Sequence, residues 1–102
     1  MSQVNHLTNS LKIASAAQSM GIPCFLGGCI ETGVGTAAAL HFGACSPNLF
    51  PALEIAGSGP FTDDIITEPF VAEHGVVHLP EGPGLGVTVN EEKLRFYSRK
   101  KE

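Results

Sequence analysis

The stretch that decides the fold covers residues 23–57 and reads PCFLGGCIETGVGTAAALHFGACSPNLFPALEIAG. A short apolar run at residues 24–26 leads through a glycine-rich loop into an alanine-rich segment at residues 36–44, and a second apolar run follows at residues 52–56. Short apolar runs without alternation are typical of strands buried on both faces, whereas the alanine-rich segment suits a closely packed helix. The order strand, helix, strand predicts two neighbouring parallel strands.

A further helix is expected before this unit. Apolar residues recur there at helical spacing, at Leu7, Leu11, Ala14, Ala17 and Met20. Gly21 and Pro23 then end the helix. Parallel sheets are covered on both faces, so two parallel strands are not stable alone. We therefore expect strands from outside this chain to complete the sheet.

The pattern changes after residue 57, where prolines and glycines interrupt every periodic run. The apolar segments 70–72 and 76–79 flank the tripeptide EHG at residues 73–75 and predict a β-hairpin. Residues 81–86 read EGPGLG and predict an ordered, extended loop. Asn90 predicts the N-cap of a short terminal helix.

Composition excludes several classes of protein. The 102 residues carry a formal net charge of −4, with 43% hydrophobic and 16% charged residues, which is typical of a globular chain. The basic cluster at residues 95–101 suits a solvated helix end, so we expect no nucleic-acid partner. No apolar run reaches the ~18 residues of a membrane span, and residues 1–10 lack the apolar core of a signal peptide, so we expect no membrane association.

The cysteines bear on the cellular compartment. There are three, Cys24, Cys29 and Cys45, and they form no CxxC pair. An odd count without paired spacing argues against a disulfide framework and against a structural zinc site. We expect buried thiols in a reducing, cytoplasmic environment.

Two carboxylates are candidate catalytic residues. Glu31 follows the first apolar run, at the end of a parallel strand where barrels carry their chemistry. It either orients a base or a substrate, or it caps the helix that begins near Thr36; both interpretations stay open. Glu54 lies inside the second apolar run, where an unpaired carboxylate is costly. We favour a role as general acid, or as partner of a lysine, over a structural ion pair.

Three further residues are assigned to substrate binding. Gly33 and Gly35, ahead of the helix, would let the backbone approach a substrate, and Ile30 stands beside them. Adjacent side chains diverge, so Asp63 and Asp64 are interpreted as a helix or turn start rather than a metal site. The histidines show no ligand spacing, and we expect no metal ligand in this chain.

Four segments, in the same order and with close spacing, resemble the muconate cycloisomerase/mandelate racemase branch of the enolase superfamily. They are residues 7–14 (LTNSLKIA), 31–38 (ETGVGTAA), 54–65 (EIAGSGPFTDDI) and 83–87 (PGLGV). The resemblance implies an α/β fold, namely the C-terminal fragment of a (β/α)8-type barrel. Residues 1–57 would form a partial TIM barrel with its helix 6, strand 7, helix 7 and strand 8. Residues 58–102 would form an irregular C-terminal segment, with hairpin, GPGLG loop and short terminal helix, that returns toward the capping domain.

The resemblance also implies a reaction. Such enzymes bind a carboxylate substrate on Mg²⁺ and abstract the proton α to the carboxylate. Their base lysines lie on the second and sixth strands and their metal ligands on the third to fifth strands, all outside this chain. Glu54 matches the acid of the eighth strand, and Glu31 matches the acidic residue of the seventh-strand loop. We expect a muconate cycloisomerase-like isomerase or lactonising enzyme that is inactive as this fragment alone, acting on a small carboxylate.

Departures from the family pattern narrow this expectation. The mandelate racemase type has a histidine base on the seventh strand, but residues 23–31 contain no histidine. The dipeptide epimerase type has Asp-x-Asp on the eighth strand, where residues 54–56 read EIA. Asn5 and His6 stand where the family usually has two glycines. A cycloisomerase-like parent gains weight, with a racemase or dehydratase of a small acid as the alternative.

Two classes of function therefore stay open. Met1 begins just after the expected position of the sixth-strand lysine, so a barrel fragment would need the missing barrel portion, or a homo-oligomer, as its partner. The rival is a non-catalytic α+β binding module that folds alone. The rival predicts a compact monomer with a cooperative thermal transition, whereas the fragment hypothesis predicts aggregation, a molten state, or oligomerisation that hides the strand edges.

Overall fold

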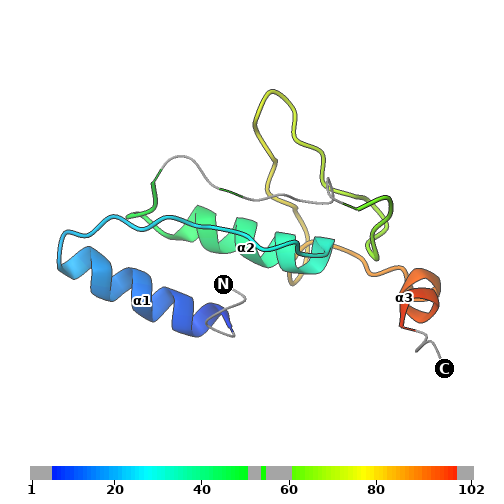
Figure 1. Cartoon of the computed structure of the whole chain (residues 1–102), viewed down its shortest axis with the longest axis horizontal. Helices are drawn as coiled ribbons and strands as arrows, with labels where there is room; N and C mark the ends of the chain where they lie inside the picture. The colour runs from blue at the N-terminus through cyan, green and yellow to red at the C-terminus, as the bar shows by residue number, and fades with distance from the viewer. Residues whose placement is uncertain (1–5, 51–53, 55–60, 99–102) are drawn as a thin grey trace.

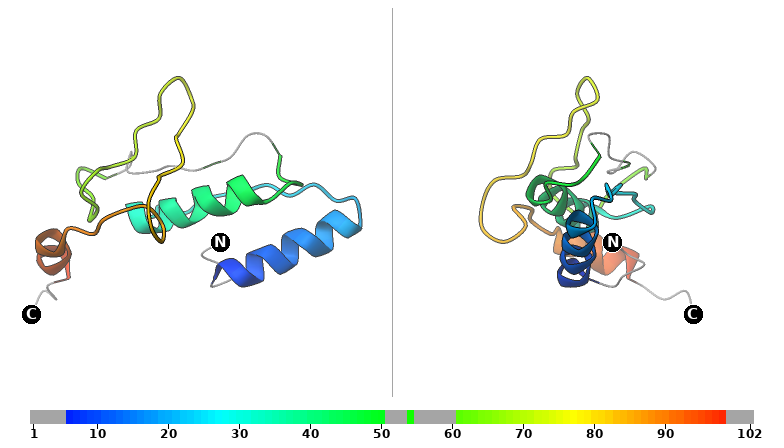
Figure 2. Two further views of the ribbon diagram at one scale, coloured as in Figure 1. Left: turned by 180° about the vertical axis from the view of Figure 1, so that it is seen from behind. Right: turned by 90° about the vertical axis from the view of Figure 1, so that its left-hand side faces the viewer.

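The computed structural model describes residues 6–50, 54 and 61–98. These residues contain the helices α1 (Leu7–Ser19), α2 (Gly33–Cys45) and α3 (Glu91–Tyr97). α1 lies beside α2, and the segment between them runs back along both helices, while α3 lies at the other end of the molecule (Figure 1; Figure 2). Each helix predicted from the sequence is present.

α1 is defined by local signals at both ends. The His6 ring nitrogen Nδ1 accepts a hydrogen bond from the Asn9 N–H at 3.3 Å, which caps the start of the helix. Gly21 follows the C-cap with a φ of +68°, and its N–H donates to the Gln18 carbonyl at 3.0 Å. The helix therefore stops where the sequence predicts.

α2 begins three residues earlier than the sequence predicts. Gly33 and Gly35 belong to its first turn and not to a loop, so the expected helix start near Thr36 is wrong. The reason is not local, because the first turn is held by residues 64–66, described below. Six of its residues are buried: Gly33, Thr36, Ala37, Ala39, Leu40 and Phe42. α2 is thus the central helix of the described structure.

The segment before α2 and the segment after it pair with each other in parallel, as predicted. Isolated parallel bridges join Cys24 to Leu49 and Gly27 to Glu54. The Phe50 N–H donates to the Cys24 carbonyl at 2.7 Å, and the Glu54 N–H donates to the Leu26 carbonyl at 3.0 Å. Apart from Glu54, the expected strand at residues 52–56 lies outside the described residues, as does the boundary between residues 57 and 58. The observed unit is strand-like segment, helix, strand-like segment.

The hairpin after residue 69 is confirmed at its tip. Glu73 and Val76 form an antiparallel bridge in which each N–H donates to the other's carbonyl at 2.9 Å. The two turn residues have positive φ, at 52° for His74 and 79° for Gly75, as a two-residue type I′ turn requires. The hairpin projects from the rest of the molecule (Figure 1).

A second antiparallel contact connects the hairpin region to α3. Ile66 bridges Val89, and the Asn90 N–H donates to the Ile65 carbonyl at 2.7 Å. Asn90 then caps α3, because its side chain accepts the Lys93 N–H at 3.0 Å. The expected N-cap is therefore confirmed.

The EGPGLG loop is ordered and non-helical, as predicted. At Gly86, with a φ of +71°, an added Cβ would stand 2.9 Å from the Pro80 backbone, so only glycine fits without a shift. The loop also contacts α2, where the His41 Nε2 lies 3.1 Å from the Leu85 carbonyl oxygen. This contact joins the C-terminal segment to the central helix.

The described core is small and the surface is large. Four buried residues form the core cluster, namely Ala14, Leu26, Ala39 and Phe42. The radius of gyration is 14.8 Å, where about 13 Å is typical of a compact domain of this length. The accessible surface is 7338 Å², against about 5500 Å² for a folded monomer of this mass. The chain is more open than an independent globule.

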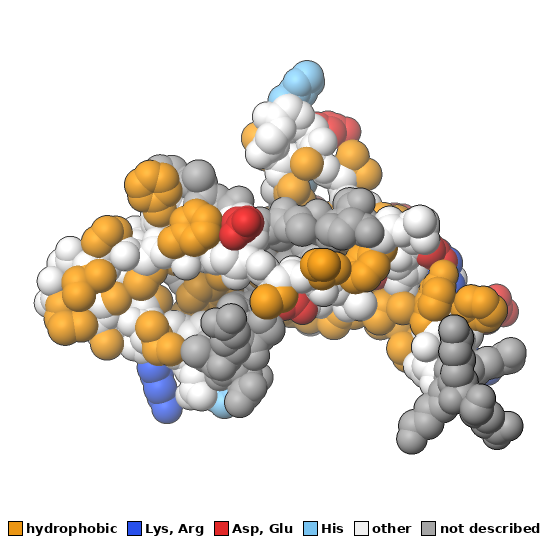
Figure 3. All heavy atoms as spheres, viewed as in Figure 1, with side chains coloured by type: hydrophobic (Ala, Val, Ile, Leu, Met, Phe, Trp, Pro, Cys, Tyr) orange, Lys and Arg blue, Asp and Glu red, His pale blue; other side chains and the backbone are white. Residues whose placement is uncertain are grey.

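Apolar groups account for part of this exposed surface. Phe25 is 57% exposed and Phe50 is 55% exposed, and hydrophobic side chains are spread over the face shown in Figure 3.

The expectation of buried thiols is wrong for Cys29 and Cys45. Both are exposed, because Cys29 lies in the loop before α2 and Cys45 is the last residue of α2. In the described ranges, every helix falls short of the length and apolar character that a membrane crossing requires.

Candidate functional site

Glu54 forms the later of the two parallel bridges among the described residues. Its backbone bridges Gly27, and its Oε2 would be 3.7 Å from a Cβ placed on that glycine. The carboxylate therefore lies over the backbone of the first parallel segment, and the Glu54 side chain is exposed. Carboxyl ends of parallel strands share one edge of a sheet, which is where α/β folds place catalytic groups.

Glu31 lies against the first turn of α2. A Cβ on Gly35 would stand 2.9 Å from the Glu31 Oε2 and 3.1 Å from its Cβ. The half-buried carboxylate is thus held at the positive end of the helix dipole. Thr32, at the N-cap position, makes no side-chain capping bond. This geometry agrees with the helix-terminus interpretation of Glu31, and its role toward a substrate stays a prediction.

The three residues assigned to substrate binding differ in their surroundings. Gly33 is buried, and a Cβ there would overlap the Ile66 side chain and stand 3.0 Å from the Asp64 Oδ2. Gly35 provides the room that Glu31 occupies. Ile30 is 68% exposed. Close packing against neighbouring side chains therefore explains why glycine stands at positions 33 and 35. Contact of Ile30, Gly33 or Gly35 with a substrate stays a prediction.

Asp64 is the residue of this region whose importance the sequence analysis missed. It is 3% exposed, and its Oδ1 accepts the Gly33 N–H at 3.0 Å and the Ile65 N–H at 2.6 Å. The interpretation of Asp63 and Asp64 as a helix or turn start is wrong in one respect, because Asp64 caps a helix 31 residues earlier in the chain. The two isoleucines that follow it were the available signal of burial.

Asp63 points elsewhere and holds α3. Its Oδ1 pairs with the Lys93 Nζ at 2.5 Å, and its Oδ2 accepts from the Tyr97 hydroxyl at 2.9 Å. The Lys93 hydrogen bond, together with the bond from Tyr97, lowers the pKa of the Asp63 carboxyl. The same carboxylate raises the pKa of Lys93 and the pKa of Tyr97 by hydrogen bonding to their protonated forms. The two adjacent aspartates therefore anchor different helices.

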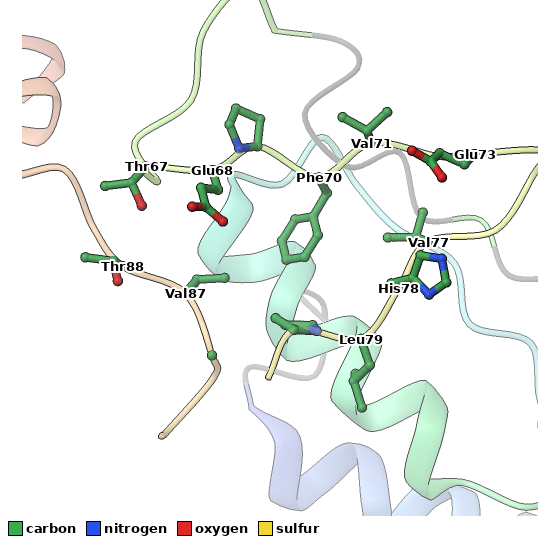
Figure 4. Close-up of a pocket in the computed structure, with 13 residues that line it drawn as sticks. Thr67, Glu68, Phe70, Val71, Glu73, Val77, His78, Leu79, Val87 and Thr88 are labelled. Carbon is green, nitrogen blue, oxygen red and sulfur yellow. The ribbon is translucent and has the colours of Figure 1, made fainter. Parts of the chain in front are cut away.

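A separate cavity of about 380 Å³ lies between the hairpin and the last extended segment. In Figure 4, Phe70 points from its segment into the space between Val87 and Leu79. The cavity lining contains none of the residues predicted for the site. Its position thus gives no support to a catalytic role for this cavity.

Within residues 6–50, 54 and 61–98, no three His, Cys, Asp or Glu side chains come together in a way that could hold a metal ion. Glu31 and Glu54 belong to no such group. The residues described here do not by themselves fit a Mg²⁺ site.

Comparison with known proteins identifies the family. The model of the family described as enolase C-terminal domain-like matches residues 1–93. The chain therefore belongs to the enolase C-terminal domain-like family, and the resemblance stated from the sequence is confirmed.

Individual relatives are enzymes of this superfamily. The o-succinylbenzoate synthase of Enterococcus faecalis is 39% identical over 95% of this chain and 26% of its own length. A chloromuconate cycloisomerase of Delftia acidovorans is 38% identical over 91% of this chain and 25% of its own length. The crystal structure of the muconate lactonizing enzyme from Klebsiella pneumoniae superposes with a TM-score of 0.82 at 37% identity, covering 95% of this chain and 27% of that one. The chain spans about a quarter of the length of these relatives.

Proposed function

We propose that this chain supplies the C-terminal part of the active site of a cytoplasmic, muconate cycloisomerase-like isomerase or lactonising enzyme. The reaction is abstraction of the proton α to a carboxylate, followed by cycloisomerisation. The observation that carries the proposal is the parallel bridge between Gly27 and Glu54, which brings the Glu54 backbone beside the segment that precedes α2. The similarity to cycloisomerases over nearly the whole chain supports it.

In this proposal the two carboxylates have different tasks. Glu54, whose side chain is exposed, is the acid that exchanges a proton with the substrate. Glu31, held against α2, is a supporting carboxylate that orients a neighbouring group. Ile30 and the backbone at Gly33 and Gly35 face the small carboxylate substrate. The base lysines come from outside this chain, because Lys12 lies within α1, on the helix that precedes the first parallel segment.

The proposed parent enzyme uses Mg²⁺, which would neutralise the substrate carboxylate and the charge that develops next to it. Its ligands would come from outside the described residues, which hold no suitable group. The proposed partner is the remainder of the barrel, whether on the same polypeptide, on another chain or in a homo-oligomer. The open shape and the exposed apolar side chains favour such a partner over a binding module that folds alone.

Sequence identity alone does not select one reaction of the superfamily, because an o-succinylbenzoate synthase and a chloromuconate cycloisomerase match this chain at nearly the same identity. Cycloisomerisation is preferred because residues 23–31 lack the histidine of the mandelate racemase type. A racemase or dehydratase of a small acid is the alternative within the same superfamily.

The proposal is tested by transplanting residues 1–93 into the matching quarter of the Klebsiella muconate lactonizing enzyme. We expect the chimera to turn over muconate in the presence of Mg²⁺. Glu54→Gln keeps the size of the side chain but removes the ionisable proton, so we expect kcat to fall about 100-fold. The matched control is Glu81→Gln, an exposed carboxylate in the EGPGLG loop, with unchanged kcat. Equal activity of the two variants would exclude Glu54 as the acid.

A further inference from the structure

The start of α2 is capped from a distant part of the chain. Asp64 is almost fully buried, and its Oδ1 accepts the Gly33 N–H at 3.0 Å while also accepting the Ile65 N–H at 2.6 Å. Helix N-termini present unpaired N–H groups and a positive dipole end, so a buried carboxylate is stabilising there. The local N-cap residue, Thr32, makes no side-chain bond of this kind. Asp64 therefore takes over the capping task.

The same contact is locked by packing. Ile66 is fully buried, and its side chain fills the place where a Cβ of Gly33 would stand. The Ile66 backbone is in turn held by its antiparallel bridge to Val89. The first turn of α2 is thus fixed by both a polar and an apolar contact from residues 64–66.

Glu31 lies against this same turn. A Cβ added to Gly35, in the first turn of α2, would stand within 3.1 Å of both the Oε2 and the Cβ of Glu31. The carboxylate position is therefore set by where the first turn of α2 stands. A movement of Gly33 away from Asp64 would carry the Gly35 backbone, and with it the surface on which Glu31 lies.

We infer that Asp64 is a positioning residue for Glu31, acting by capping α2 from residues 64–66. This inference rests on the proposed function, in which Glu31 is a supporting carboxylate of the site. It assigns Asp64 no contact with substrate. The chemistry needs only its buried, hydrogen-bonded carboxylate at the helix start.

The first test uses substitutions of Asp64 in the chimera. Asp64→Ala removes both acceptor oxygens, and we expect kcat to fall about 10-fold or more because Glu31 is displaced. Asp64→Asn keeps an oxygen that accepts the Gly33 N–H, so we expect it to recover most of the lost activity. Asp63→Asn is the matched control, since it weakens the contacts with α3 and keeps a side-chain oxygen that can accept the Asp64 N–H. Equal loss in the Asp64→Ala and Asp63→Asn chimeras would overturn the inference.

The second test separates positioning from stability. Gly35→Ala favours the helix by intrinsic propensity but pushes Glu31 away from its place. We expect a chimera that melts at the same or a higher temperature and has a lower kcat. Unchanged kcat at unchanged stability would contradict the inference.

The third measurement does not depend on activity. In the folded chimera, hydrogen exchange of the Gly33 amide should be slow, and Asp64→Ala should speed it about 10-fold, with Asp63→Asn close to the original rate. Fast exchange of this amide in the folded, unmodified chimera, or no effect of Asp64→Ala, would reject the cap. An inactive chimera with this exchange pattern intact would reject the proposed function instead.

Discussion

At the scale of single residues, Gly33 shows how a distant contact fixes the identity of a position. Its backbone donates to Asp64, and the space beside its Cα is filled by Ile66. From the sequence, Gly33 was assigned to a glycine-rich loop before a helix and to substrate binding. The structure supplies the specific reason, which is the close approach of a side chain from 33 positions later in the chain.

This packing predicts a coupling between two substitutions. Gly33→Ala should lower the free energy of unfolding by about 1–3 kcal/mol, because the new methyl group meets the Ile66 side chain. Ile66→Ala should lower it by about 2–5 kcal/mol through loss of a fully buried side chain. The double variant should cost less than the sum, since each change relieves the other. Urea unfolding of the chimera measures all three, and strict additivity would show that the two residues do not meet.

The sequence offers local signals for the two candidate carboxylates but none for the residue that caps α2. Glu54 was indicated by a charge inside an apolar run, and Glu31 by its place after a strand, which are both local signals. Asp64 was missed because its partner, Gly33, lies 31 residues away. Long-range hydrogen bonds leave no spacing pattern in a single sequence, so only the folded chain shows them.

At the scale of elements, helices with local signals were predicted well. α1 ends at a glycine with positive φ, and α3 begins at an asparagine that caps it. The start of α2 was placed too late because its determinants are tertiary. The parallel pairing was predicted from the order of the segments, but the register, Gly27 opposite Glu54, required the coordinates.

The ion pair and hydrogen bonds that hold α3 predict that its stability is constant near neutral pH and falls at acidic and strongly basic pH. The lowered pKa of Asp63 means that its contribution is present above 3.8 and is lost as the pH falls through the folded-state value below it. The raised pKa values of Lys93 and Tyr97 mean that their contributions are present below 10.5 and 10.0 and are lost as the pH rises through the higher folded-state values.

Amide exchange in α3, corrected for intrinsic rates, measures this dependence. We expect constant protection between pH 5 and 9 and a fall below pH 3.8. Lys93→Gln should weaken protection across the range and flatten the acid step, because it removes the main partner of Asp63. The effect should be small, since this ion pair is partly exposed and screened by salt. An acid step of the same size in Lys93→Gln would contradict the assignment.

At the scale of the whole molecule, the chain has the features of a unit that packs against further protein structure. Its radius of gyration and its surface both exceed those of a compact domain of this size. Two parallel segments are paired only with each other in the described residues, and large apolar side chains beside them are exposed. The relatives that match it are about four times as long. These observations are why the sequence indicated the family readily but could not show a complete site.

The most direct measurement of this account is Mg²⁺-dependent turnover of muconate by the 102-residue chain alone, beside the chimera under the same conditions. In our proposal the base lysines and the metal ligands lie outside this chain, and the described residues contain no group that could hold a metal ion, so an enolate on this chain alone would lack most of its electrostatic stabilisation. We therefore expect no turnover by the chain alone and clear turnover by the chimera. Mg²⁺-dependent activity of the isolated chain, or a folded chimera without any activity, would contradict the account.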